Sequence, residues 1–250
     1  MEYPEFIARF YDTIYQQVRN DTDIDFFLSK ACQSKGKVLE IGVGTGRLFL
    51  EALKKGVDIY GIDISPSMIR VLHGKMESQA RHRVWVEDAV TMNLGMKFEL
   101  ILAPFRMLSH VNEVEDQLKF FNGVAEHLQP EGQFIFDLYV PDLSLLLEGM
   151  EEYKDFEGEY DQGKRVKRYI SSHSDLIRQT THVTMTLCWE EDGKELSDCW
   201  EFDMRYFFRF EIEHLIARSS LELVTMYGDY QGNTLSKDAR DFVVVCTKKT

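Results

Sequence analysis

The chain has 250 residues and a formal net charge of −13, which argues against a nucleic-acid partner because phosphate backbones are bound mainly by lysine and arginine. Its apolar content of 44% is ordinary for a globular protein, and no apolar run approaches the ~20 residues that span a bilayer. The four cysteines include no Cys-x-x-Cys pair, and no signal peptide is visible. We therefore expect a cytoplasmic protein with reduced thiols and no membrane span.

Residues 1–30 are predicted to form a helical leader, because apolar and aromatic residues recur at helical spacing between Phe6 and Tyr15. Such a stripe can pack against the core. It can also form a lid over a ligand, with Tyr3 or Tyr11 turned inward. The two roles are compatible.

A short apolar stretch, residues 38–41, leads into three alternate glycines, Gly42, Gly44 and Gly46. A strand that ends in closely spaced glycines lets the backbone approach a ligand, and the helix predicted over 47–55 directs unpaired N–H groups toward that ligand. Dinucleotide sites favour Gly-x-Gly-x-x-Gly, but Arg47 occupies the place of the third glycine here. A turn with only a structural role is the alternative.

Two acidic residues accompany this turn. Glu40 precedes the first glycine, where an acid repels a pyrophosphate but suits a cationic amino group. Asp63 ends the next predicted strand, residues 57–62, in the usual place for a carboxylate that accepts hydrogen bonds from ribose hydroxyls. Together they point to a nucleoside-type ligand with an amino-acid tail.

This pattern of Glu40, alternate glycines and Asp63 resembles class I S-adenosylmethionine-dependent methyltransferases. The resemblance implies that S-adenosylmethionine is the cofactor and that the turn after the third strand holds its adenine, with Asp88 accepting from the exocyclic amine. The predicted helix after Ser65-Pro66 would lie near the ribose. The predicted cofactor-binding residues are Tyr11, Glu40, Gly42, Gly44, Gly46, Asp63, Ile64, Met68, Asp88, Ala89 and Ala103.

Predicted strands and helices alternate as far as residue 138, which implies a parallel sheet with helices on both faces. From about 151 to 210 the apolar period becomes two, and Asp192-Gly193 is a strong hairpin signal. A helix over 211–220 and antiparallel strands over 221–227 and 241–247 complete the pattern. The expected fold is α/β, a Rossmann-like, seven-stranded, mostly parallel sheet with an inserted antiparallel sheet of about three strands after the fifth strand.

We divide the chain into a methyltransferase core, residues 1–150 and 211–250, and the inserted sheet, residues 151–210. The aromatic strand predicted from Trp200 to Phe210 would cover the acceptor pocket or form a homodimer face. The acidic stretch 148–161 is expected to be a flexible or solvated segment.

His110 is the predicted catalytic residue. Methyl transfer from a sulfonium is an in-line displacement, so positioning supplies much of the rate, and a general base is needed only if the acceptor must lose a proton. The loop after the fourth strand carries His110 to the same end of the sheet as the glycine turn, and imidazole titrates in a suitable range. A histidine that merely packs against the sheet is the alternative.

A closer similarity concerns Tyr3 and the Tyr11-Asp12 pair. Their spacing is similar to that in sugar N,N-dimethyltransferases, which methylate amino groups of nucleotide-linked deoxysugars and also have a histidine after the fourth strand and an antiparallel insertion after the fifth. The similarity implies that Tyr3 and His110 are active-site residues. Residues 105–108, Phe-Arg-Met-Leu, stand where that family has small polar residues.

No metal site is expected, because Pro104 and Phe105 follow the fourth strand where a metal-binding acid would be needed, and no His/Cys spacing suits zinc. Residues 103–106 also do not match the Asn/Asp-Pro-Pro-Tyr motif of enzymes that methylate DNA adenine or protein glutamine.

The predicted function is a methyltransferase acting on an amine or hydroxyl of a small molecule. The alternatives are a nicotinamide-dependent oxidoreductase, disfavoured by Glu40 and Arg47, and a non-catalytic cofactor-binding protein.

Overall fold

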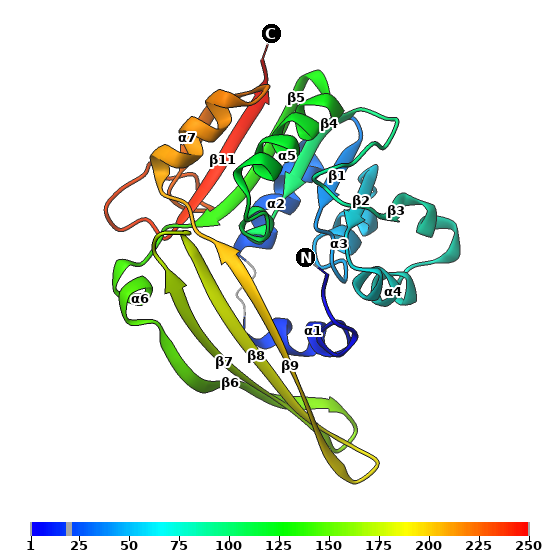
Figure 1. The fold of residues 1–250 in the computed structure, drawn as a ribbon. Helices are drawn as coiled ribbons and strands as arrows, with labels where there is room; N and C mark the ends of the chain where they lie inside the picture. The colour runs from blue at the N-terminus through cyan, green and yellow to red at the C-terminus, as the bar shows by residue number, and fades with distance from the viewer. Residues whose placement is uncertain (1, 19–21, 250) are drawn as a thin grey trace.

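The computed structural model describes residues 2–18 and 22–249. Two sheets organise them. The strands of the larger sheet are β1 (Val38–Ile41), β2 (Ile59–Asp63), β3 (Val84–Val86), β4 (Phe98–Ala103), β5 (Leu128–Tyr139), β10 (Leu221–Tyr227) and β11 (Asp241–Lys248). The strands of the smaller sheet are β6 (Met150–Asp161), β7 (Lys164–Asp175), β8 (Thr180–Glu191) and β9 (Lys194–Arg205). Figure 1 shows the smaller sheet extending away from the larger one.

The larger sheet is mostly parallel, with seven strands in the order β10-β11-β5-β4-β1-β2-β3. β1 pairs in parallel with β2 and β4, whereas β11 pairs antiparallel with β5 and β10. The chain builds outward from β1 to β3 and then returns to β4 on the other side of β1. The crevice at the carboxyl ends of β1 and β4 is therefore the switch point where open α/β sheets bind ligands. The predicted sheet is confirmed.

Helices cover both faces of this sheet (Figure 1). The helices are α1 (Glu5–Val18), α2 (Thr22–Gln33), α3 (Phe49–Lys54), α4 (Pro66–Lys75), α5 (Val114–His127), α6 (Leu143–Glu148) and α7 (Arg209–Arg218), with two short 3-10 helices, η1 (Ser78–Arg83) and η2 (Met107–His110). Successive strand residues point to opposite faces. Leu39 and Ile101 pack with α5 and α7, whereas Val38 and Leu100 pack with α2, α3 and α4.

The inserted sheet has four antiparallel strands, not about three, in the order β6-β7-β8-β9. The stretch 148–161, expected to be flexible or solvated, has mostly exposed side chains but is a strand: Met150–Asp161 form β6 and pair with β7. As an edge strand, β6 can expose most of its charged side chains, which is why it lacks the alternation of a buried strand. The hairpin at Asp192-Gly193 is confirmed: both residues have positive φ, and Glu191 pairs with Lys194.

The strand predicted to run to Phe210 ends at Arg205. Glu211 accepts a hydrogen bond from the Phe208 N–H at 2.9 Å, and α7 begins at Arg209. This local helix start outweighs the alternation of aromatic residues that continues past Arg205 in the sequence.

α1 lies between the inserted sheet and α4 (Figure 1). Its apolar side packs into a separate core with Met68 of α4 and with the inner face of the inserted sheet. That core contains Ile7, Ala8, Phe10, Ile14, Met68, Phe156, Val166, Val183, Met185, Leu187, Trp200 and Phe202. The leader and the inserted sheet are therefore positioned together, next to the carboxyl ends of the core strands.

Within the described part of the chain, no helix combines the length and apolar character needed to cross a lipid bilayer.

Candidate active site

A cavity of about 470 Å³ lies at the carboxyl ends of β1, β2 and β4. Its volume is within the range of ~300–1,000 Å³ that is usual for small-molecule and cofactor sites. The structure brings ten of the predicted site residues together around it, from the leader, the glycine turn, the end of β2, the turn after β3 and the loop after β4. They are Tyr3, Tyr11, Gly42, Gly44, Asp63, Ile64, Met68, Asp88, Ala89 and His110.

Three predicted residues do not line the cavity: Glu40, Gly46 and Ala103. Glu40 and Ala103 are fully buried within β1 and β4. A Cβ on Gly46 would lie 2.4 Å from Leu72 Cδ1, so this glycine lets the turn pack against α4. Gly46 and Ala103 would therefore contribute to cofactor binding only indirectly, whereas the buried Glu40 carboxylate, two residues before Gly42, has no hydrogen-bond partner.

The glycine turn lies directly against the loop after β4. Gly42 has a φ of +75°, and a Cβ there would lie 2.7 Å from Met107 Cγ, so only glycine permits this approach. The N–H groups of Gly42 and Val43 both donate to the Ile62 carbonyl, which fixes the turn to the end of β2. The helix that follows is shorter than predicted, because α3 begins at Phe49.

Asp63 holds the turn and the start of α4 together. Its Oδ2 accepts from the Gly44 N–H and its Oδ1 accepts from the Ser65 N–H, each at 2.8 Å. Burial raises the pKa of the Asp63 carboxyl, and the two N–H donors oppose that rise. Each carboxylate oxygen keeps acceptor capacity for a ligand hydroxyl. On the next turn, Asp88 faces the same cavity and accepts from the Val90 N–H at 2.9 Å.

The leader closes one side of the cavity. Ser65 Oγ donates to the Tyr3 carbonyl at 3.1 Å. Asp12 accepts from Thr45 Oγ1 in the glycine turn and from Lys75 Nζ in α4, each at 2.6 Å. These contacts tie α1 to the glycine turn and to α4; a lid role for the leader stays a prediction.

His110 lies on the side of the cavity where α1 and the inserted sheet meet. Tyr3 Oη is 3.3 Å from His110 Nε2, and His110 Nδ1 is buried without a hydrogen-bond partner. Burial lowers the pKa of His110 to about 4, so the ring is neutral at pH 7 and can accept a proton or a hydrogen bond. Two rings of the inserted sheet lie beside this pair: Trp200 is 4.6 Å from Tyr3 and Phe202 is 6.1 Å from His110, centroid to centroid.

Several lining residues were not predicted, namely Met107, Val111, Asn112, Glu113 and Asp116. They follow β4 in a segment that carries no sequence motif. The only signal that could have predicted them is their position after a parallel strand, where open α/β sheets bind ligands. Among residues 2–18 and 22–249, no group of three or more His, Cys, Asp or Glu side chains is arranged to hold a metal ion.

Residues 38–132 match the family model described as a methyltransferase domain. The matched segment contains the glycine turn, Asp63, Asp88 and His110. Residues 38–132 form a methyltransferase domain.

Solved structures extend the likeness of this methyltransferase domain to the whole chain. The CcbJ methyltransferase from Streptomyces caelestis superposes with a TM-score of 0.81 at 22% identity, covering 98% of this chain and 96% of that one. The sugar N-methyltransferase KedS8 from Streptoalloteichus sp. gives a TM-score of 0.77 at 15% identity, covering 100% of this chain and 94% of that one. At these identities the likeness shows the fold, and the predicted fold with its inserted sheet is confirmed.

Curated sequence relatives match about half of this chain. The putative methyltransferase YqeM of Bacillus subtilis is 22% identical over 132 residues, which cover 51% of this chain and 53% of YqeM. The chain thus spans about half the length of the curated relatives it matches. The prediction of a methyltransferase is confirmed for residues 38–132, which match the methyltransferase-domain model. The residues that bind the cofactor, and the acceptor, stay predictions.

We predict that the protonation state of Glu40 changes when the cofactor binds. Neither carboxylate oxygen has a hydrogen-bond partner, and burial raises the pKa of Glu40 well above its usual value, although the Arg47 charge opposes this. We expect the carboxyl to ionise when a cationic amino group binds nearby, and so to release a proton. Calorimetric titration with S-adenosylhomocysteine at pH 7, in buffers of different ionisation enthalpy, measures this release. Glu40→Gln should abolish it; the same release in both proteins would disprove the coupling.

Proposed function

We propose that the chain is an active methyltransferase that transfers a methyl group to an amine or hydroxyl of a small molecule. The single observation that supports this most is the cavity that joins Gly42, Gly44 and Asp63 to His110. The residues suit S-adenosylmethionine: Asp63 has acceptor capacity for ribose hydroxyls, Asp88 can accept from the adenine amine, and Glu40 is a buried carboxylate without a partner.

On the acceptor side, His110 and Tyr3 orient the attacking atom. The neutral imidazole accepts a hydrogen bond from the acceptor's N–H or O–H, which directs a lone pair toward the methyl carbon. When bound, S-adenosylmethionine supplies the methyl group, and the C–S electron pair leaves with sulfur as a neutral thioether. Where the acceptor must lose its proton, His110 takes it, and Tyr3 stabilises the ring by hydrogen bonding.

Within this proposal an amine is the favoured acceptor. Glu113 and Asp116 line the cavity and favour a cationic amine, although Lys119 at 2.8 Å from Asp116 and Arg178 at 3.9 Å from Glu113 offset part of their charge. The likeness to KedS8, described as a sugar N-methyltransferase, supports the same choice. The net charge of −13 supports a small molecule over a nucleic acid. The homodimer, the cytoplasmic location and the division into 1–150 with 211–250 and 151–210 stay predictions.

The proposal is tested in two steps. Thermal shift with S-adenosylmethionine and S-adenosylhomocysteine measures cofactor binding, and mass spectrometry of a panel of amino sugars, other amines and alcohols measures methyl transfer. We expect a stabilising shift and a gain of one methyl group on an amine. A shift without transfer to any compound would favour a non-catalytic cofactor-binding protein. Binding of a reduced nicotinamide dinucleotide in place of either ligand would favour an oxidoreductase.

Tyr3→Phe is expected to lower turnover about 10-fold, which corresponds to about 1.4 kcal/mol of transition-state stabilisation, because it removes the hydroxyl beside His110 Nε2. The affinity for S-adenosylhomocysteine should change less than about twofold, since Asp63 and Asp88 are untouched. Tyr160→Phe is a matched control, because its hydroxyl donates to the Glu190 carbonyl on the inserted sheet, away from the cavity. Equal turnover of Tyr3→Phe and wild type would remove Tyr3 from the mechanism.

A further inference from the structure

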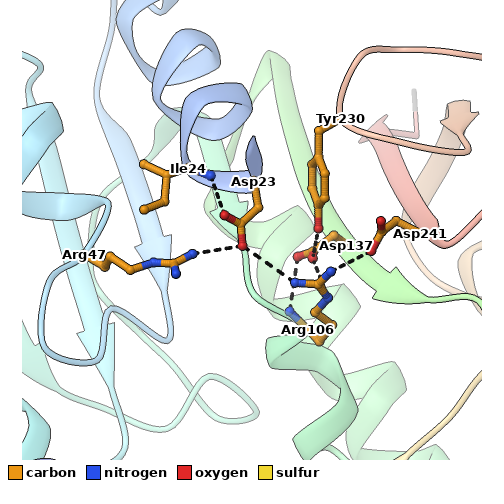
Figure 2. Close-up of polar contacts among 7 residues, drawn as sticks. All are labelled: Asp23, Ile24, Arg47, Arg106, Asp137, Tyr230 and Asp241. Atoms are coloured by element: carbon orange, nitrogen blue, oxygen red, sulfur yellow. Dashed lines mark hydrogen bonds and ion pairs between the residues drawn. The ribbon is translucent and has the colours of Figure 1, made fainter. Parts of the chain in front are cut away.

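A largely buried network of charges surrounds Arg106, in the segment that leads to His110; Figure 2 shows its contacts. We call it the Arg106 network; its members are Asp23, Arg47, Arg106, Asp137, Tyr230 and Asp241. Arg106, only 8% exposed, forms ion pairs with carboxylates of three different elements. Its guanidinium nitrogens lie 3.2 Å from Asp137 of β5, 2.6 Å from Asp241 of β11 and 3.7 Å from Asp23 of α2.

The network keeps Arg106 charged and fixed. Burial alone would lower the pKa of Arg106, but Asp137, the neighbouring tyrosines and Asp241 outweigh it, and the pKa is raised. Asp137 is fully buried and also accepts from Tyr230 Oη at 2.7 Å and from the Arg106 N–H at 3.2 Å. The guanidinium further lies 4.1 Å from the centroid of the Tyr139 ring. Both the side chain and the backbone of Arg106 are thus held by neighbouring strands.

The backbone at this point is strained. Phe105 and Arg106 both have a φ of 62°, and two successive non-glycine residues in the left-handed region are unfavourable unless the surroundings impose them. The consequence is that the two side chains diverge: Phe105 lines the cofactor cavity, whereas Arg106 points away from it into the network. The ion pairs of Arg106 supply the restraint that this turn needs.

The same turn sets the position of His110. The Ser109 N–H donates to the Arg106 carbonyl at 2.9 Å, so η2 begins directly after Arg106 and ends at His110. Met107, the first residue of η2, lies against Gly42. A shift of Arg106 would therefore move the whole segment that brings His110 to Tyr3.

Asp23 extends the restraint to the glycine turn. Its Oδ2 accepts from Arg47 Nη2 at 2.9 Å, and Figure 2 shows this carboxylate between Arg47 and Arg106. The Arg47 guanidinium carbon also lies 4.1 Å from the centroid of the Phe105 ring. One carboxylate of α2 thus links the cofactor loop with the loop that carries His110.

We propose that Arg106 is a positioning residue for methyl transfer: through its ion pairs with β5, β11 and α2, it holds the strained turn after β4 so that His110 meets Tyr3 opposite the glycine turn. The inference rests on the proposed function of the cavity. Arg106 does not line that cavity, so it acts through His110 and not on the substrate.

The experiment compares Arg106→Met, Arg106→Lys and Asp241→Asn with wild type. The ring signals of the seven histidines are recorded by NMR against pH, and His110 is assigned with His110→Gln. In Arg106→Met we expect the His110 signal to shift and its pKa to rise from about 4 toward 6.5 as water reaches the ring. Turnover should fall at least 30-fold, with S-adenosylhomocysteine affinity within threefold. Lysine keeps the charge without the planar fork, so Arg106→Lys should give a smaller change of the same kind.

Arg168→Met is the matched control, because Arg168 is 4% exposed and pairs with Asp155 at 2.6 Å in the inserted sheet. It should destabilise the protein without moving the His110 signal. A folded Arg106→Met protein with an unchanged His110 signal would overturn the proposal. If Arg106→Met does not fold, Asp241→Asn removes a single ion pair and gives the same readout. The NMR measurement needs neither cofactor nor acceptor. If the wild type transfers no methyl group, the proposed function is refuted, but the NMR signal of His110 still tests whether Arg106 positions it.

Discussion

Asp63→Ala is expected to weaken the binding of S-adenosylmethionine about 100-fold, or ~2.7 kcal/mol. The substitution removes the acceptor predicted to hold the ribose hydroxyls, and it also releases the Gly44 and Ser65 N–H groups, which shape the glycine turn and the start of α4. Isothermal titration calorimetry with S-adenosylmethionine and S-adenosylhomocysteine measures the effect on both ligands.

Asp58→Ala is the matched control for Asp63. Asp58 precedes the same strand at its other end, and its carboxylate pairs with Arg83 at 2.5 Å outside the cavity. The control should bind both ligands as wild type does. Wild-type affinity in Asp63→Ala would remove the ribose assignment and, with it, the main cofactor contact that the sequence predicts.

His110→Ala is expected to lower turnover by 10²–10⁴, the range typical of a general acid or base, and to leave cofactor affinity within about threefold. The reason is that His110 lies on the proposed acceptor side of the cavity, where its ring contacts Tyr3 and Phe202. Steady-state kinetics on the acceptor found in the panel, together with calorimetry, separates the two effects. Unchanged turnover would leave His110 as a packing residue.

The lowered pKa of His110 also predicts a pH dependence. The ring titrates near 4 in the folded protein and near 6.5 in the unfolded chain, so its contribution to stability is present above 6.5 and is lost as pH falls toward 4. Between pH 6.5 and pH 4 the unfolded state binds this proton more readily than the folded state does. The free energy of unfolding therefore falls by an amount on the order of 1–3 kcal/mol. Urea unfolding of wild type and His110→Gln at pH 7.5 and 4.5 isolates it, because other groups titrate alike in both. An equal loss in the two proteins would contradict the burial of His110. On an acceptor that does not itself ionise in this range, turnover should likewise hold down to pH 6.5 and fall only toward pH 4.

In two places a local pattern left the backbone structure open. The acidic stretch 148–161 was expected to be flexible or solvated; its side chains are mostly exposed, but it forms an edge strand, which needs only one partner. The aromatic alternation from Trp200 continues to Phe210, but the strand ends where Glu211 offers a helix start. Pairing with β7 selected the structure of the first stretch, whereas a local helix start between Phe208 and Glu211 ended the second.

The sequence by itself predicted the part of the cavity around the glycine turn. A strand, a glycine turn and an acid at the end of the next strand are short-range features, and their geometry follows from backbone sterics and strand direction. Only the tertiary structure decided how the residues beyond this turn come together. Tyr3 meets His110 across 107 residues, and Arg106 reaches Asp241 across 135. The strained Phe105–Arg106 turn and the unpaired carboxylate of Glu40 have no signature along the chain, because both exist only when packing from distant segments imposes them.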